Sequence, residues 1–251
     1  MKKFVRFQHQ GQTGWGILEE DLVLCLEGTP PHETRESGQR LKLEEVRLLA
    51  PCMPSKVVAV GLNYRDHAEE TGHPIPEEPL LFMKPSTAVI GPGESIRLPS
   101  ASQRVDYEAE LAVVLAKRTY CVSEKEALDH VWGYTCLNDV TARDLQAKDG
   151  QWTRSKSFDT FCPLGPWIVE GLDPTELSVE GWLNGELRQR SSTRNLIFPV
   201  PRLVSFVSHI MTLLPGDVIA TGTPSGIGPL RSGDRFQVRI EKVGILENPV
   251  G

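Results

Sequence analysis

The chain has 251 residues with a formal net charge of −6, and 39% of its residues are hydrophobic. Its lysines and arginines are scattered, so the sequence has no basic stripe that would suit a nucleic-acid backbone or an anionic membrane. No apolar run reaches the length of a bilayer span, and residues 4–10 lack the apolar character of a signal peptide. These features predict a cytoplasmic protein that binds neither nucleic acid nor membrane.

The first 50 residues are predicted to form a small β domain. Residues 3–7 and 15–26 are typical of strands, and the glycines between them suit a hairpin turn. Residues 27–40 contain two successive prolines and several charges, so they are the best candidate for a linker. We therefore expect two domains, residues 1–50 and residues 51–251.

Three carboxylates share one face of a predicted strand in the middle of the chain. Because side chains in a strand alternate between faces, Asp106, Glu108 and Glu110 point the same way. Six apolar residues follow, which is typical of a strand covered on both faces. Buried carboxylates are costly unless a cation compensates them, and the next basic residue along the chain is Lys117. The pattern favours a bound metal, and a strand whose first half projects into water is the alternative.

A short helix is predicted within residues 63–72. His67 and Glu70 are three residues apart and so share one helix face, where the carboxylate can orient the imidazole as an acid/base pair. The alternative is a solvated polar helix in which the two side chains have no special partner. Flanking glycines and prolines fit a mobile lid as well as a plain loop.

Asp139 stands where a predicted strand, residues 133–139, runs into a predicted helix. An aspartate at this junction is a good N-cap. Asp139, Arg143 and Gln146 would also share one helix face, where the carboxylate could hold a metal and Arg143 could bind a substrate carboxylate. An intrahelical Asp139–Arg143 pair of little energetic value is the alternative.

Two lysines outside these motifs are further candidate site residues. Lys156 lies in a polar loop near two aromatic residues and could neutralise a carboxylate-rich site. Lys84 precedes a proline at the end of a predicted strand, residues 79–86, and could face a substrate. A lysine in that position is more often simply solvated.

Three further elements are predicted in the C-terminal part of the chain. Asn184 and Gly185 favour a β-hairpin with a type I′ turn, and the apolar spacing of residues 203–213 favours a helix. Residues 218–228 are typical of a strand followed by a Gly-rich loop. The glycines allow backbone N–H groups to approach an anion, although the loop matches neither a P-loop nor a dinucleotide fingerprint.

Taken together, these segments closely resemble the fumarylacetoacetate hydrolase family over about residues 50–250. One motif by itself would be weak, but their ordered set is very specific: Val60-Gly61-Leu62-Asn63-Tyr64, Asp106-Tyr107-Glu108-Ala109-Glu110-Leu111, Asn138-Asp139-Val140-Thr141-Ala142-Arg143-Asp144, Lys156-Ser157-Phe158-Asp159-Thr160, Asn184-Gly185-Glu186 with Gln189, and Pro215-Gly216-Asp217 with Thr221-Gly222-Thr223-Pro224. The resemblance implies a mainly β fold with short helices. A mixed β-sandwich roll would form the main domain beside the small N-terminal β domain, and the protein would be a homodimer.

The resemblance also implies a metal centre. In the family, the positions matching Glu108, Glu110 and Asp139 bind Mg²⁺ or Mn²⁺, and the position matching Lys156 lies beside the metal. Three carboxylates without a cysteine or histidine ligand form an all-oxygen site, which suits Mg²⁺, Mn²⁺ or, as a substitute, Ca²⁺ rather than zinc.

Further roles follow from the same resemblance. The positions matching His67 and Glu70 belong to a lid helix that carries the catalytic acid/base pair. Those matching Arg143, Gln146 and Thr223 are substrate contacts.

These residues predict an enzyme that acts on small 2-oxo acids through a metal-bound enolate. The leading reactions are hydrolysis of a C–C bond in an acylpyruvate or fumarylpyruvate, with water activated by His67, and decarboxylation of oxaloacetate. The alternative is the 2-hydroxyhepta-2,4-diene-1,7-dioate isomerase or 5-oxopent-3-ene-1,2,5-tricarboxylate decarboxylase of aromatic catabolism. A structural cation-binding sandwich is the non-enzymatic alternative, but it has no use for the His67–Glu70 pair or for Lys156.

Overall fold

The computed structural model describes residues 1–72 and 74–251, without the side chains of His67 and Thr71. These residues form three sheets of twelve, four and three strands, and their α-helices are short. The mainly β fold with short helices that the sequence predicted is therefore confirmed. No described helix combines the length and the apolar composition needed to cross a bilayer.

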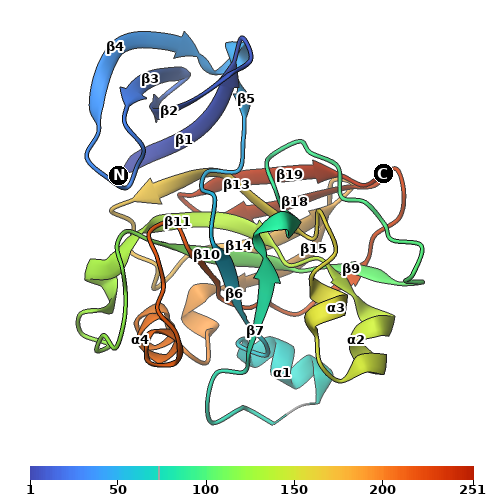
Figure 1. Ribbon diagram of the computed structural model, residues 1–251. Helices are drawn as coiled ribbons and strands as arrows, with labels where there is room; N and C mark the ends of the chain where they lie inside the picture. Colours follow the sequence, from blue (N-terminus) through green and yellow to red (C-terminus); the bar gives the residue numbers. More distant parts are fainter. Residues whose placement is uncertain (73) are drawn as a thin grey trace.

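The twelve-stranded sheet runs through the whole molecule (Figure 1). Its hydrogen-bonded order is β4-β3-β2-β1-β13-β11-β10-β16-β6-β7, with β5 beside β1 and β8 beside β13. Neighbouring strands along this path are antiparallel except for β16 and β6, which run parallel. The bounds are β1 (Lys2–His9), β2 (Gln12–Glu19), β3 (Leu22–Glu27), β4 (Arg35–Lys42), β5 (Arg47–Leu48), β6 (Lys56–Val60), β7 (Leu81–Pro85), β8 (Val89–Ile90), β10 (Ala109–Leu115), β11 (Val131–Asn138), β13 (Cys162–Glu170) and β16 (Val218–Ala220).

Two smaller sheets complete the β structure. The four-stranded sheet has the order β15-β14-β18-β19, and the three-stranded sheet has the order β12-β9-β17. The turn at Asn184 and Gly185 joins β14 to β15, as the sequence predicted. The bounds are β9 (Val105–Tyr107), β12 (Thr141–Ala142), β14 (Ser178–Leu183), β15 (Glu186–Ser192), β17 (Gly228–Pro229), β18 (Arg235–Ile240) and β19 (Gly244–Pro249).

Strand β10 lies at the centre of the packing and is buried on both faces. Leu111 and Val113 belong to the hydrophobic cluster that also contains residues of β14, β18 and β19. Ala112 and Val114 belong to a second cluster on the opposite face of the strand. The expectation of a strand covered on both faces is therefore confirmed, and the carboxylate of Glu110 begins the face that continues into Ala112 and Val114.

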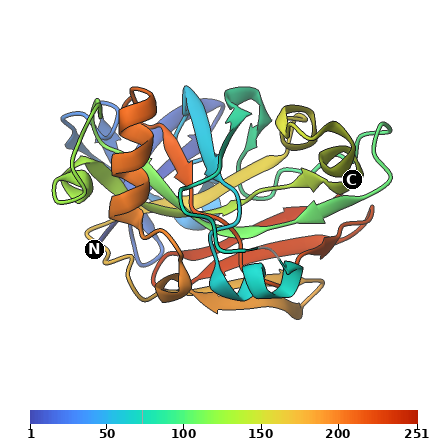
Figure 2. The ribbon, with the colours of Figure 1, turned by 90° about the horizontal axis from the view of Figure 1, so that it is seen from below.

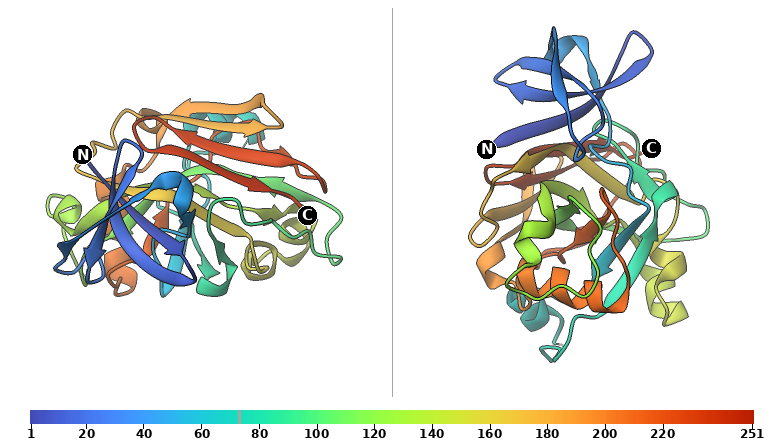
Figure 3. Two further views of the ribbon diagram at one scale, coloured as in Figure 1. Left: turned by 90° about the horizontal axis from the view of Figure 1, so that it is seen from above. Right: turned by 60° about the vertical axis from the view of Figure 1, so that its left-hand side comes forward.

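Strands β1 to β5 form a curled lobe at one end of the molecule (Figures 1 and 3). The lobe has its own hydrophobic cluster, yet β1 also pairs with β13, with Phe4 opposite Ile168. Two expectations for this region were wrong. Residues 15–26 form two strands, because Glu20 turns the chain with a φ of 52°, and the expected linker contains β4. Strand β4 is almost entirely exposed and polar, so it carries no hydrophobic period; backbone pairing with β3 defines it. A division near residue 50 stays a prediction.

The described residues form four α-helices outside the sheets. Their bounds are α1 (Arg65–Thr71), α2 (Arg143–Asp149), α3 (Thr153–Lys156) and α4 (Val200–Ile210). Helix α4 begins at Val200, three residues before the predicted start. Pro201 is tolerated in its first turn, because an N–H group there would have no intrahelical acceptor. Figure 2 shows α4 along one side of the sheets and α1 beside β15, to which Ser191 Oγ links it by donating to Asp66 Oδ2 at 2.5 Å.

Hydrogen bonds to Asp217 link the start of β6 to the turn before β16. Its buried carboxylate accepts hydrogen bonds from Ser55, from the Leu214 N–H and from Lys56 Nζ at 2.6 Å. Burial opposes ionisation, but these hydrogen bonds outweigh it and hold the pKa of Asp217 below its ordinary value. The stability that this carboxylate contributes is therefore present above the unfolded-state pKa of about 4 and is lost as pH falls through the lower folded-state pKa.

We predict that Asp217→Asn lowers the free energy of unfolding at pH 7 by about 1–3 kcal/mol, because the buried charged hydrogen bonds are weakened. The variant should also lose less stability than the parent between about pH 5 and pH 2. Urea unfolding across this pH range measures both effects, with the exposed Asp129→Asn as the control. An acid-side slope equal to that of the parent would contradict the assignment.

Candidate functional site

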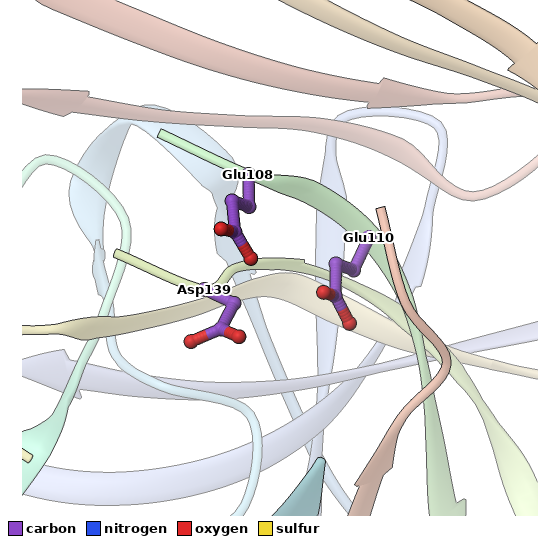
Figure 4. Close-up of side chains that lie close together, drawn as sticks. All are labelled: Glu108, Glu110 and Asp139. Atoms are coloured by element: carbon purple, nitrogen blue, oxygen red, sulfur yellow. The ribbon is translucent and has the colours of Figure 1, made fainter. Parts of the chain in front are cut away.

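Three buried carboxylates converge beside the centre of the large sheet (Figure 4). Glu108 lies between β9 and β10, Glu110 lies in β10, and Asp139 follows β11. One oxygen of each lies within 4.8 Å of the others. The antiparallel pairing of β10 with β11 sets Ala109 opposite Asn138, and the Asp139 N–H donates to the Glu108 carbonyl at 2.9 Å. The strand ladder therefore brings the third carboxylate to the first two.

The helix expected to begin at Asp139 begins later. Ala142 is the N-cap of α2, and Thr141 and Ala142 pair with β9 in a strand conformation. Asp139, Arg143 and Gln146 therefore do not share a helix face, and the N-cap interpretation of Asp139 was wrong. Arg143 and Gln146 do share the first turn of α2, where Arg143 Nη1 donates to Gln146 Oε1 at 2.6 Å.

Cations from distant parts of the chain compensate two of the carboxylates. Lys156 Nζ donates to Glu108 Oε2 at 2.9 Å and to Asp139 Oδ2 at 2.6 Å. Lys84 Nζ donates to Asp139 Oδ1 at 2.5 Å, and Arg143 Nη2 donates to Glu108 Oε1 at 2.5 Å. Lys156 thus pairs with the carboxylates, as the sequence suggested, and Lys84, with 0% exposure, is not solvated.

Asp106 does not join the three converging carboxylates, although it shares their strand alternation. Its buried carboxylate accepts from Arg104 Nε at 3.0 Å and from Arg143 Nε at 2.9 Å. Arg143 therefore spans Asp106, Glu108 and Gln146, and each of its three nitrogens already donates to a protein acceptor. This arginine positions Glu108 within the fold.

Glu110 and Glu108 have opposite electrostatic environments. Glu110 Oε2 accepts from the Gly222 N–H at 2.8 Å, and no described lysine or arginine forms an ion pair with it. Burial, together with the charges of Asp139 and Glu108, raises its pKa well above the ordinary value. Burial opposes ionisation of Glu108 too, but Lys156 and Arg143 lower its pKa to about 2. The three carboxylates offer oxygen ligands alone, and Glu110 has no countercharge among the described residues. Such a set of ligands suits a divalent cation.

A cavity of about 490 Å³ opens onto Glu108 and Glu110. Arg143, Gln146, Lys156 and Thr223, which the sequence named, line it as well. The hydroxyl of Thr223 donates to the Ala109 carbonyl at 3.0 Å and accepts from Gln189 Nε2 at 2.8 Å. The structure thus brings all of these residues to one site.

Gln189 is a residue of this site whose role the sequence did not reveal. Its Nε2 also donates to the Pro224 carbonyl at 2.8 Å, and its Oε1 accepts from the Ala109 N–H at 2.9 Å. It therefore fixes the Gly-rich loop to the start of β10. A nearly inaccessible glutamine in a hairpin strand has no local sequence signal beyond its place in the family motif.

Helix α1 reaches the site from the side of the Gly-rich loop. The carboxylate of Glu70 accepts from the Gly226 N–H at 3.1 and 3.3 Å, and Pro74 and Pro76, just after the helix, line the cavity. The side chain of His67 lies outside the described residues. The acid/base pairing of His67 with Glu70 therefore stays a prediction.

We predict that two isosteric substitutions change the stability of the metal-free protein in opposite directions. Glu110→Gln removes a buried ionisable group that has no described cationic partner and should raise the melting temperature. Glu108→Gln removes a charged acceptor from both Lys156 and Arg143 and should lower it. Both variants should bind Mn²⁺ at least tenfold more weakly by calorimetry. Equal changes in the melting temperatures of the two variants would contradict the inference that cations compensate Glu108 but not Glu110.

Comparison with known proteins places this site in a family. Residues 56–251 match the family model described as fumarylacetoacetate (FAA) hydrolase C-terminal, and residues 2–51 match the one described as Rv2993c-like, N-terminal. An uncharacterized protein of Archaeoglobus fulgidus is 63% identical over 84% of this chain and 84% of its own length. The mitochondrial oxaloacetate tautomerase FAHD2B of Bos taurus is 41% identical over 99% of this chain and 80% of its own length.

Two solved structures extend the comparison. The 2-hydroxyhepta-2,4-diene-1,7-dioate isomerase of Mycobacterium marinum has a TM-score of 0.94 at 40% identity, covering 100% of this chain and 98% of its own. The maleylpyruvate hydrolase of Sphingobium sp. SYK-6, in complex with manganese(II) and pyruvate, has a TM-score of 0.83 at 30% identity, covering 99% and 98%. The chain belongs to the fumarylacetoacetate hydrolase family, whose members are enzymes.

Proposed function

We propose that this protein is a divalent-metal-dependent enzyme that acts on small 2-oxo acids through their enolates. The convergence of Glu108, Glu110 and Asp139, the first two of which line a cavity, carries the proposal. These residues would hold Mg²⁺ or Mn²⁺. When bound, the cation supplies a Lewis acid that stabilises negative charge on the keto oxygen of a 2-oxo acid. The related hydrolase in complex with manganese(II) and pyruvate supports this choice of metal and substrate class.

The residues around the carboxylates each have a defined part in this proposal. Lys156 places a positive charge beside Glu108 and Asp139 at the cavity and favours an anionic substrate head group. Lys84 and Arg143 hold Asp139 and Glu108 in fixed orientations. His67, oriented by Glu70, would move the proton at the substrate carbon or activate a water.

Two types of reaction share the enolate and remain candidates. We place cleavage of a C–C bond first, either by hydrolysis of an acylpyruvate or by decarboxylation of oxaloacetate. The second candidate is proton transfer without cleavage. The oxaloacetate tautomerase that aligns with 99% of this chain and the isomerase with a TM-score of 0.94 favour it.

We predict that turnover requires a divalent metal and that the products identify the reaction. The protein, supplied with Mg²⁺ or Mn²⁺, is incubated with acetylpyruvate, fumarylpyruvate, oxaloacetate and 2-hydroxyhepta-2,4-diene-1,7-dioate, and the products are resolved by chromatography. A chelator should abolish activity, and excess metal should restore it. Glu108→Ala should remove both metal binding and turnover. Undiminished turnover by metal-free protein would refute the proposed mechanism.

A second prediction concerns the proton-transfer group. His67→Ala should lower the turnover number by about 10²-fold or more, as loss of a general base commonly does. Its affinity for Mn²⁺ should stay within about twofold of the parent, because His67 is not among the proposed ligands. His32→Ala, in the N-terminal lobe, is the matched control. Parental turnover in the His67 variant would exclude the assigned role.

A further inference from the structure

The cavity has apolar walls apart from the site residues already described. Leu62, Leu80, Phe82, Trp152 and Ile227 line it together with two prolines and backbone. The apolar surface begins directly beside the carboxylates, since the Phe82 ring centroid lies 4.8 Å from Lys156 Nζ. A ligand whose head group reaches Glu108 and Glu110 therefore places the rest of its length against hydrocarbon.

This apolar wall is closely packed. The Phe82 and Trp152 rings meet edge to face with centroids 5.2 Å apart. The Gly61 N–H donates to the Leu80 carbonyl at 2.8 Å, and a methyl group at Gly61 would come within 3.2 Å of both Leu80 and Trp152. Leu80, Phe82 and Trp152 also line an outer groove of about 950 Å³, whose two lysines, Lys56 and Lys84, are paired with Asp217 and Asp139.

Among the described residues that line the cavity, the basic side chains are Lys156 and Arg143. Both are occupied by protein acceptors: Lys156 by Glu108 and Asp139, and Arg143 by Asp106, Glu108 and Gln146. A second carboxylate at the far end of a substrate would lose its water against apolar walls without gaining a basic partner among these residues. Such a transfer is strongly unfavourable.

We propose that the physiological substrate is a 2-oxo monocarboxylic acid whose far end is an uncharged apolar group. This inference rests on the proposed function, because it takes the 2-oxo acid head group as given. It separates this protein from relatives whose names specify substrates with a second carboxylate. An apolar tail buried against this wall gains affinity, about fourfold for each methylene removed from water.

Binding of two shape-matched 2-oxo acids tests the inference without turnover. In 5-methyl-2-oxohexanoate an isopropyl group replaces the far carboxylate of 2-oxoglutarate. Calorimetric titration of the Mg²⁺-loaded protein should show at least tenfold tighter binding of 5-methyl-2-oxohexanoate. Equal or tighter binding of 2-oxoglutarate would overturn the inference. If either acid binds but no 2-oxo acid is turned over, that result counts against the proposed function. The ratio of the two dissociation constants still supports or overturns the inference.

A charge introduced into the wall provides a second measurement. Leu80 is 52% exposed, so Leu80→Lys should fold, and it adds a basic side chain to the part of the lining where the described residues have none. The variant should shift the binding ratio toward 2-oxoglutarate by at least tenfold. Met83→Lys is the matched control, because Met83 is 50% exposed nearby but lines the outer groove and not the cavity. An unchanged ratio in Leu80→Lys, or the same shift in Met83→Lys, would overturn the inference.

Discussion

The structure depends on the uneven compensation of three buried carboxylates. Transferring an ion into a protein interior costs several kcal/mol unless partners replace its water. Lys156, Lys84 and Arg143 replace that water for Glu108 and Asp139, and they come from α3, β7 and α2. These elements must therefore dock around the end of β10 for the carboxylates to be buried, so the ion network helps to determine where they lie.

Glu110 is the exception that gives the site its chemistry. Its described partner is the Gly222 N–H, and Gly222 adopts a φ of 97° while lying against Asn63, a position where a Cβ would come within 2.8 Å. A glycine there satisfies both the backbone conformation and the close approach. The fold thus keeps one carboxylate without a described cationic partner, which sacrifices stability and leaves a negative charge that the proposed divalent cation would compensate.

The cavity has a charged floor and an apolar wall, which suit different parts of a ligand. Charged groups held by the sheet and by α2 and α3 gather on the floor, where a polar head group and a metal would bind. Leu80, Phe82 and Trp152 form an apolar wall beside this floor, and apolar surroundings strengthen electrostatic interactions. The floor is built mainly from the family motifs, whereas the wall, apart from Leu62, comes from residues between and beyond them. The wall is therefore where relatives with the same floor can differ in substrate.

The sequence by itself determined the features that depend on local periodicity. The alternation of β10 put Glu108 and Glu110 on one face, the Asn184–Gly185 turn made a hairpin, and the family motifs added Asp139 and Lys156. Local pattern misplaced Asp139 at a helix start, because pairing of residues 141–142 with β9 extends the strand conformation. It also missed β4, which has no hydrophobic period. The tertiary structure decided the ion pairs of Lys84 and Arg143, the hydrogen bonds of Gln189 and the apolar wall. These contacts join residues that are far apart in the chain: Gln189 bonds to Thr223, 34 positions away, and to Ala109, 80 positions away. No local period encodes such contacts; they arise only when the strands pack.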